Sequence, residues 1–245
     1  MAQSGPETIE LLYRFKFDDG SEKDFPVKLK SDSLELVLDE NFAKPEWTKL
    51  KYHQCERCPL PDTVEFCPVA ANLSSLVESF QDSISFEKTS VTVETKERTF
   101  VRNTTLQKGL SALVGIYMVT SNCPVMDKLR PMVRFHLPFA TSRETVYRAV
   151  TMYLMAQFFI MRKGGKPDWE LKNLAEIYKA VSFVNRGISQ RISNASNRDA
   201  NVNAVVILHS VGESLPYVID NGLDDLEPLF ADYIGRIEEL NYVGS

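Results

Sequence analysis

The sequence predicts an α+β fold in which N-terminal antiparallel strands and a cysteine knuckle pack on a mainly helical C-terminal part. Apolar residues alternate with polar ones in 8–39 and in 84–103, which is the period of half-buried strands. From about residue 105 they recur at the spacing of amphipathic helices. This shift divides the chain into a strand-rich part with the cysteine cluster, 1–104, and a helical part, 105–245, which we expect to form one integrated unit.

Residues 8–39 are expected to hold three strands. Asp18–Ser21 has the chemistry of a hairpin turn, with a glycine that can take positive φ. Pro26 lies in the second strand and cannot donate to a ladder, which places that strand at an edge of the sheet. The third strand is predicted over Leu34–Val37. A further pair of strands is expected in 84–103.

Helical periodicity and capping residues predict the remaining elements. The expected helices cover about 68–80, 106–117, 124–133, 144–162, 169–193, 199–217 and 224–240. Asp168 is the expected N-cap of the helix that begins at Trp169. The uncharged segment Ala149–Met161 is too short to span a bilayer, so we interpret it as part of a buried core helix.

Composition excludes several classes of protein. The 245 residues carry a net charge of −5, which gives no general attraction to nucleic acid or to an anionic membrane. The N-terminus lacks a basic segment followed by an apolar run, so no secretory signal is expected. Four cysteines without an export signal are typical of thiols or metal ligands rather than disulfides, which favours a cytoplasmic location.

Three of the four cysteines lie close together in the sequence. Cys55 and Cys58 have the C-x2-C spacing that places two sulfurs on one ion, and Cys67 follows nine residues later. Such a set predicts a tetrahedral metal site. Its fourth ligand is either His53, which would make the site entirely local, or Cys123, which would join the helical part to the first part.

Two arguments favour Cys123 as the fourth ligand. Cys67 and Cys123 each precede a proline that is expected to open a helix, where the helix dipole favours the thiolate. His53 and Cys55 are two apart, so in a strand their side chains would point to opposite faces. We therefore predict a structural zinc held by Cys55, Cys58, Cys67 and Cys123, with His53 as the alternative ligand.

Other interpretations of the cysteines stay open. Proline commonly follows the ligands of iron–sulfur clusters, so a cluster is the alternative cofactor. No flavin or other redox motif accompanies the cysteines, and zinc is preferred for that reason. Cys55 and Cys58 could also form a dithiol redox switch without metal. Finally, free cysteines are commonly buried with no ligand at all.

A second cluster follows Cys123. Arg130, Arg134 and His136 lie among apolar residues, and arginines can hold an anion through paired hydrogen bonds. They are the candidate ligand-binding residues of an enzyme or sensor for an anionic small molecule. The competing interpretation is that they pair with nearby carboxylates and cover apolar surface with their stems. The sequence contains none of the common hydrolase, P-loop, dinucleotide or zinc-protease motifs, and no catalytic residue is predicted.

The chain resembles an uncharacterised bacterial family of unknown function. The resemblance rests on Cys55-x2-Cys58-Pro59, on Cys67–Ala70, on Gly115–Met118 and on the run from Cys123-Pro124 to Phe139. It implies a single soluble bacterial protein and no particular activity. The expected function is thus metal binding in a role that the sequence does not identify. Its partner would be a protein or small molecule, and the apolar helix Val146–Met161 offers a surface for a homodimer.

Overall fold

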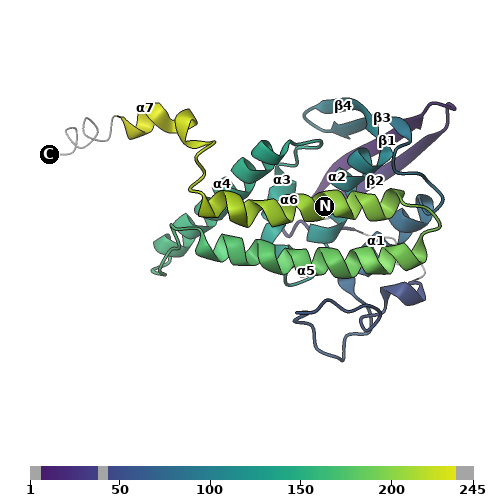
Figure 1. The fold of residues 1–245 in the computed structure, drawn as a ribbon, viewed down its shortest axis with the longest axis horizontal. Coiled ribbons are helices and arrows are strands. Elements are labelled where there is room, and N and C mark those ends of the chain that lie inside the picture. The colour runs from purple at the N-terminus through teal and green to yellow at the C-terminus, as the bar shows by residue number, and fades with distance from the viewer. Residues whose placement is uncertain (1–6, 38–43, 236–245) are drawn as a thin grey trace, which may run out of the picture.

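The structure is a computed structural model, and it describes residues 7–37 and 44–235 of the chain. The predicted α+β class is confirmed: an antiparallel sheet of four strands is followed by a mainly helical part (Figure 1). The strands are β1 Thr8–Phe17, β2 Glu22–Lys30, β3 Lys88–Thr95 and β4 Thr99–Thr105. The α-helices of the described residues are α1 Pro68–Ser79, α2 Leu106–Val119, α3 Pro131–Arg134, α4 Ser142–Arg162, α5 Lys172–Ala195, α6 Ala200–Asp220 and α7 Ala231–Ile234. Short 3₁₀ helices cover Glu46–Thr48, Met126–Leu129 and Glu227–Phe230.

The sheet has the strand order β2-β1-β3-β4, with every neighbouring pair antiparallel. β2 therefore lies at an edge, as Pro26 predicts. The third N-terminal strand is not formed: residues after β2 make a turn, and only one isolated bridge joins Leu29 to Leu36. Leu34 takes a left-handed conformation with φ of 57°, which breaks the extended backbone that a strand needs.

One face of the sheet supports the core. Tyr13, Phe15 and Val91 are fully buried there, and Phe80 at the end of α1 packs edge-on against Phe15. α2 packs on β3 and β4, and α1 and α6 lie against α2. The hydrophobic core runs without a break across residue 105, where the strand-rich segment meets the helices.

Two long helices, α5 and α6, form a hairpin. α5 and α6 lie side by side along most of their length (Figure 1), joined by the short turn at 196–199. α6 is, among the described residues, the helix that is long and apolar enough to cross a membrane by length and composition. Core helices of soluble proteins have the same composition, and α6 packs along both α2 and α5.

α4 differs from its prediction in burial. Its first half is buried through residues such as Val146 and Tyr153. Its second half turns apolar side chains to solvent, with Met155 62% and Phe159 51% exposed. The core interpretation of 149–161 is therefore wrong for the C-terminal half, where these apolar side chains are left uncovered.

Two helix ends also differ from the prediction. α5 begins at Lys172 instead of Trp169, because Leu171 before it is left-handed with φ of 61°. Asp168 still accepts a hydrogen bond from the Asn173 amide at 2.8 Å, close to the predicted capping role. The helix expected over 224–240 is formed as a 3₁₀ turn and the short α7, and its last residues lie outside the described part of the chain.

Candidate functional site

Residues 48–66 form a closed loop that carries Cys55 and Cys58, called here the cysteine loop, and α1 begins directly after it with Cys67 as its N-cap. Its two ends pair with each other: the Leu50 amide donates to the Glu65 carbonyl and the Cys67 amide to the Thr48 carbonyl, both at 2.8 Å. At the tip side, the Cys58 amide donates to the Cys55 carbonyl at 3.1 Å, which closes a tight turn. Backbone hydrogen bonds thus fix both the turn that holds Cys55 and Cys58 and the paired ends of the loop, called here its base.

Arg191 attaches this base to α5. Its side chain is fully buried, and its guanidinium donates to the carbonyls of Trp47, Lys49 and Leu50 at 2.7–2.8 Å. No carboxylate of the described residues forms an ion pair with it. A buried charge without a counter-ion is expensive, so the surroundings of Arg191 need a source of negative charge.

All four cysteines line one small cavity, called here the thiol cavity. Its volume is about 20 Å³, which is room for roughly one atom-sized guest. Cys55 and Cys58 come from the cysteine loop, Cys67 from the start of α1, and Cys123 from the segment after α2. The remaining wall includes Val184 and other residues of α5. The structure therefore brings together the four predicted thiols from three separate segments.

Cys67 and Cys123 occupy matching backbone environments. The carbonyl of each accepts a hydrogen bond at 2.9 Å from the amide four residues on, which begins a helical turn. Burial raises the pKa of the Cys67 thiol, and the amides of Ala70 and Val69 act against it by donating to the sulfur. Cys123 repeats the pattern: burial raises its pKa and two following backbone amides oppose this. Amides aimed at sulfur are suited to stabilise thiolates.

Cys55 packs against α5. Burial and the other three thiols raise its pKa to about 12, so without a cation it would stay protonated. Gly187 of α5 leaves room for the Cys55 side chain next to the helix. A Cβ there would lie 3.0 Å from Cys55 Sγ and 3.4 Å from the His53 carbonyl oxygen. Only glycine lets the helix approach so closely.

The surroundings of the thiol cavity are cationic. Phe183 lines the cavity, and the guanidinium of Arg57 lies 4.7 Å and that of Arg186 5.1 Å from its ring centre. Arg191 lies close enough to lower the pKa of Cys55 and Cys67 against the larger effect of burial. Within the described part of the chain, no aspartate or glutamate lines the cavity. This environment favours a guest centre with net negative charge.

His53, the alternative ligand, lies elsewhere. Its side chain is exposed, and its Nε2 is 3.0 Å from the Asn194 amide nitrogen at the end of α5. It does not line the thiol cavity. The described residues contain no group of three or more His, Cys, Asp or Glu side chains that could hold a metal ion in its present arrangement. Coordination would thus require the thiols to turn inward around their Cα–Cβ bonds.

The second predicted cluster is divided by the fold. Arg130 is held in place by an ion pair to Asp127, by Asn122 at 2.7 Å and by two backbone carbonyls. Arg134 is exposed and lies over the ring of Phe135. Neither lines a cavity among the described residues, whereas His136 does. The positions of the two arginines suit the competing interpretation, in which arginines of this cluster pair with nearby carboxylates and cover apolar side chains.

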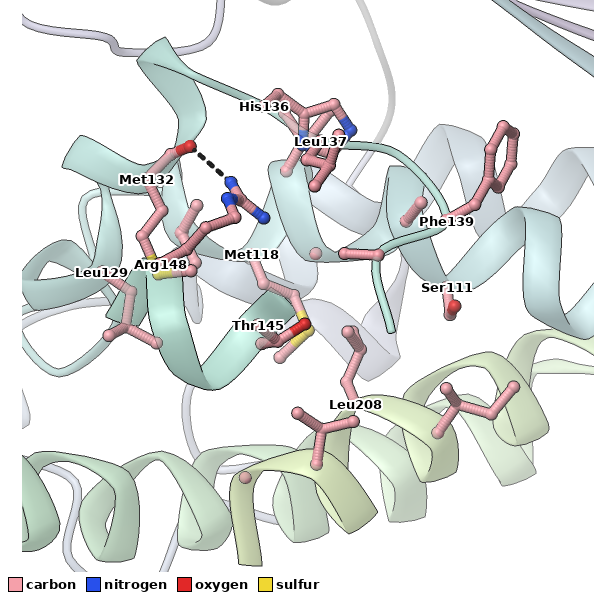
Figure 2. Close-up of a pocket in the computed structure, with 18 of the residues that line it drawn as sticks. Ser111, Met118, Leu129, Met132, His136, Leu137, Phe139, Thr145, Arg148 and Leu208 are labelled. Atoms are coloured by element: carbon pink, nitrogen blue, oxygen red, sulfur yellow. Dashed lines mark hydrogen bonds between the residues drawn. The ribbon is translucent and has the colours of Figure 1, made fainter. Parts of the chain in front are cut away.

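His136 lies at the wall of a second, much larger cavity, called here the apolar cavity. Its volume is about 520 Å³, and α2, α4, α5, α6 and the segment around α3 enclose it (Figure 2). Arg148 extends from α4 toward Met132 and the segment carrying His136 and Leu137. Tyr178 and Asn185 of α5 also line it. Sequence reasoning noted Arg148 beside the second cluster without assigning it a role, and it missed Tyr178 and Asn185, because no motif or spacing links them.

The fold and the thiol cavity together define an α+β protein with four cysteines gathered between a closed loop, α1 and α5. The chain belongs to the family described as Domain of unknown function (DUF6901), whose model matches residues 11–231. This agrees with the resemblance to an uncharacterised family, without testing its particular motifs. Searches of curated proteins and of solved structures find no match.

Proposed function

We propose that the protein binds a structural zinc ion through Cys55, Cys58, Cys67 and Cys123. The observation that carries the proposal is the convergence of four thiols from three segments on one cavity of about 20 Å³. Zinc takes four sulfur ligands in a tetrahedral arrangement at about 2.3 Å, and a four-thiolate site leaves no open position for substrate. The role would therefore be structural.

Charge supports the same centre. A zinc ion with four thiolates carries a net charge of −2 by simple addition. Arg191 is a buried cation beside Cys55 and Cys67, and Arg57 and Arg186 lie at the rim. With four neutral thiols instead, Arg191 would have no negative partner among the described residues. The metal centre and the buried arginine would each offset the charge of the other.

The size of the thiol cavity favours a single ion over an iron–sulfur cluster. Room for about one atom is enough for zinc once the thiols rotate, whereas a cluster of several iron and sulfide atoms needs a wider site. The ion would connect the cysteine loop to α1 and to the segment after α2, so metal binding would contribute directly to the stability of the fold.

Metal analysis of the natively purified protein tests the proposal. We expect one zinc ion per chain, no visible colour, and loss of zinc in Cys58→Ser and Cys123→Ser. Chelation should lower the temperature of unfolding, because the free energy of metal binding is part of the free energy of folding. His53→Gln is the matched control, since His53 neighbours the cluster without lining the cavity, and it should retain zinc.

Four results would contradict the proposal. A folded protein without metal would leave the thiols as unligated core residues. Loss of zinc in His53→Gln with retention in Cys123→Ser would assign the fourth position to His53. Iron with acid-labile sulfide would replace zinc by a cluster, and a metal-free protein with a reversible loss of two hydrogens from Cys55 and Cys58 would indicate a dithiol.

A further inference from the structure

The apolar cavity has the size and lining of a small-molecule site. Its volume of about 520 Å³ falls within the range of about 300–1,000 Å³ that such sites occupy. Met118, Leu129, Met132 and Leu208 provide apolar walls from four different elements. The lining residues come from β4, from several helices and from the segments between them, so tertiary packing forms the cavity, which is partly open to solvent.

Every charged residue that lines this cavity is cationic. These residues are Arg102, Lys108 and Arg148, and no aspartate or glutamate of residues 7–37 and 44–235 joins them. The chain as a whole is acidic, with net charge −5, so the cavity departs from the average of the protein. Glu144, one turn before Arg148, accepts the Thr141 amide and hydroxyl in a capping box and forms no ion pair with Arg148. Burial lowers the pKa of Arg148, and the charge of nearby Glu144 acts against this. Glu144 thus offsets part of the positive charge, and an anionic guest would offset more of it.

Arg148 has donors to spare. Its Nη2 alone makes both of the arginine's hydrogen bonds, to the Met132 carbonyl at 2.9 Å and the Phe135 carbonyl at 3.1 Å. These bonds fix the guanidinium at the cavity wall (Figure 2). Nε and Nη1 have no partner among the described residues. Nη2 belongs to both edges through which a guanidinium makes paired contacts, so a guest meets the free donors one at a time. A carboxylate oxygen can accept a single charge-assisted hydrogen bond from Nη1, which makes a carboxylate a suitable ligand group.

His136 adds a neutral donor beside Arg148. Its Nε2 lies 2.5 Å from the hydroxyl of Tyr13, which is fully buried and must donate its proton to some acceptor. If Tyr13 donates to Nε2, the neutral ring carries its own proton on Nδ1. Burial and the Arg148 charge hold the pKa of His136 near 3, so the ring stays neutral at physiological pH. Arg102 and Lys108 are exposed, so Arg148 is the partly buried cation of the three, and a single partly buried cation beside neutral donors suits a monoanion better than a dianion.

Tyr178 and Asn185 provide further polar groups on the α5 side. The Tyr178 hydroxyl has only the Met132 sulfur, 3.9 Å away, as a partner among the described residues. Asn185 is 2% exposed, and its side-chain amide has no hydrogen bond within the described residues. Gly212 of α6 lies between them: a Cβ there would be 3.8 Å from the Asn185 amide and 3.9 Å from the Tyr178 ring. Glycine at this position widens the cavity next to both polar groups.

We infer that the apolar cavity binds a small monocarboxylate with an apolar body, its carboxylate paired with Arg148 and its body packed against Met118, Leu129 and Leu208. His136 and Tyr178 would donate to the remaining lone pairs of the carboxylate. This site is separate from the thiol cavity and does not depend on the metal. It gives the protein a ligand-binding function that the structural zinc alone would not supply.

Calorimetric titration with decanoate, 1-decanol and acetate tests the inference. The three probes separate the contribution of the charge from that of the apolar body. Wild-type protein should bind decanoate about tenfold or more tightly than 1-decanol, because only the carboxylate makes charge-assisted hydrogen bonds. Acetate, which lacks the body, should bind too weakly to detect. In Arg148→Gln the affinity for decanoate should fall about tenfold or more, while that for 1-decanol stays within about twofold.

Two further variants keep the test independent of Arg148. Arg134→Gln removes an exposed arginine outside the cavity and should leave all three affinities unchanged. Gly212→Leu fills the cavity between Tyr178 and Asn185 from a helix that favours leucine over glycine, and should abolish binding of both ten-carbon probes. The inference is overturned if wild-type protein does not bind decanoate. It is equally overturned if Arg148→Gln binds decanoate like wild type, if Gly212→Leu does so, or if acetate binds as tightly as decanoate.

Discussion

The two cavities of this protein differ in almost every property. The thiol cavity holds about 20 Å³ and is lined by four groups of one kind, whereas the apolar cavity holds about 520 Å³ and has a few scattered polar groups. α5 forms part of both walls, with Val184 at the first and Tyr178 at the second. A site whose key groups are all cysteines can be recognised from the spacing of those cysteines in the sequence. A site lined by side chains from several helices cannot be recognised in the sequence, because only the packing of the helices brings those side chains together.

The largest expected effect concerns the anchor of the thiol cavity. Arg191→Met keeps most of the side-chain volume but leaves the carbonyls of Trp47, Lys49 and Leu50 without their charged donor. We expect the free energy of unfolding to fall by about 3–5 kcal/mol, as when one partner of a buried charged network is removed. Urea denaturation measures this directly.

Arg186→Met on the same helix is the control for Arg191→Met. Arg186 is exposed and contacts only the Phe183 ring and a Ser182 hydroxyl, so its removal should cost less than about 1 kcal/mol. Equal stabilities of the two variants would show that Arg191 does not anchor the cysteine loop.

A pair of glycine substitutions compares the cavities more directly. In Gly187→Ala the new Cβ would meet Cys55 Sγ at 3.0 Å, which forces the thiol aside and should cost about 1–3 kcal/mol and weaken metal retention. In Gly212→Ala the nearest atoms are 3.8 Å away, so alanine fits and should stabilise α6 by about 0.5–1 kcal/mol. Thermal unfolding of both variants measures the difference, and effects of the same sign would contradict it.

The smallest expected effect is a dependence on pH at the apolar cavity. Burial and Arg148 lower the pKa of His136 from 6.5 to about 3 in the folded protein. Between these values the unfolded chain binds a proton that the folded chain excludes, so this contribution to stability is complete above pH 6.5 and is lost as the pH falls. The slope is up to about 1.4 kcal/mol per pH unit.

His136→Asn should remove this slope. Urea denaturation between pH 6.5 and 5 should show wild type losing about 1–2 kcal/mol more than the variant. Carboxylates contribute little in this range, and the exposed His53→Gln serves as the control. A variant that loses stability as steeply as wild type would mean that His136 takes up its proton in the folded state.

The comparison also shows how far the sequence predicts a site. The spacing of Cys55 and Cys58, and the prolines after Cys67 and Cys123, predict which thiols meet, because ligand spacing and helix starts are local properties. Arg191 and Gly187 look like ordinary helical residues, and their importance depends on what α5 touches. Arg148 is one of several arginines after Cys123, and only the packing of α4 selects it over Arg130 and Arg134.

For the fold, too, the sequence predicts the local features and misses those that depend on packing. The α+β class, the edge position of β2 and most helices follow from periodicity and proline chemistry. The third strand was predicted wrongly because alternation over Leu34–Val37 does not reveal the left-handed backbone at Leu34. The burial of α4 was predicted wrongly for its second half, since apolar composition does not show where neighbouring helices end. The division of the chain at residue 104 stays a prediction.

The wall between the two cavities is thin. Val125 faces the thiol cavity and its neighbour Met126 faces the apolar cavity, directly after Cys123. If occupancy of one cavity shifts this wall, thermodynamic reciprocity requires occupancy of the other to respond by the same factor. A carboxylate that strengthens zinc binding would itself be bound more tightly by the zinc-loaded protein. The affinities of two ligands that never touch would then be coupled through two adjacent residues.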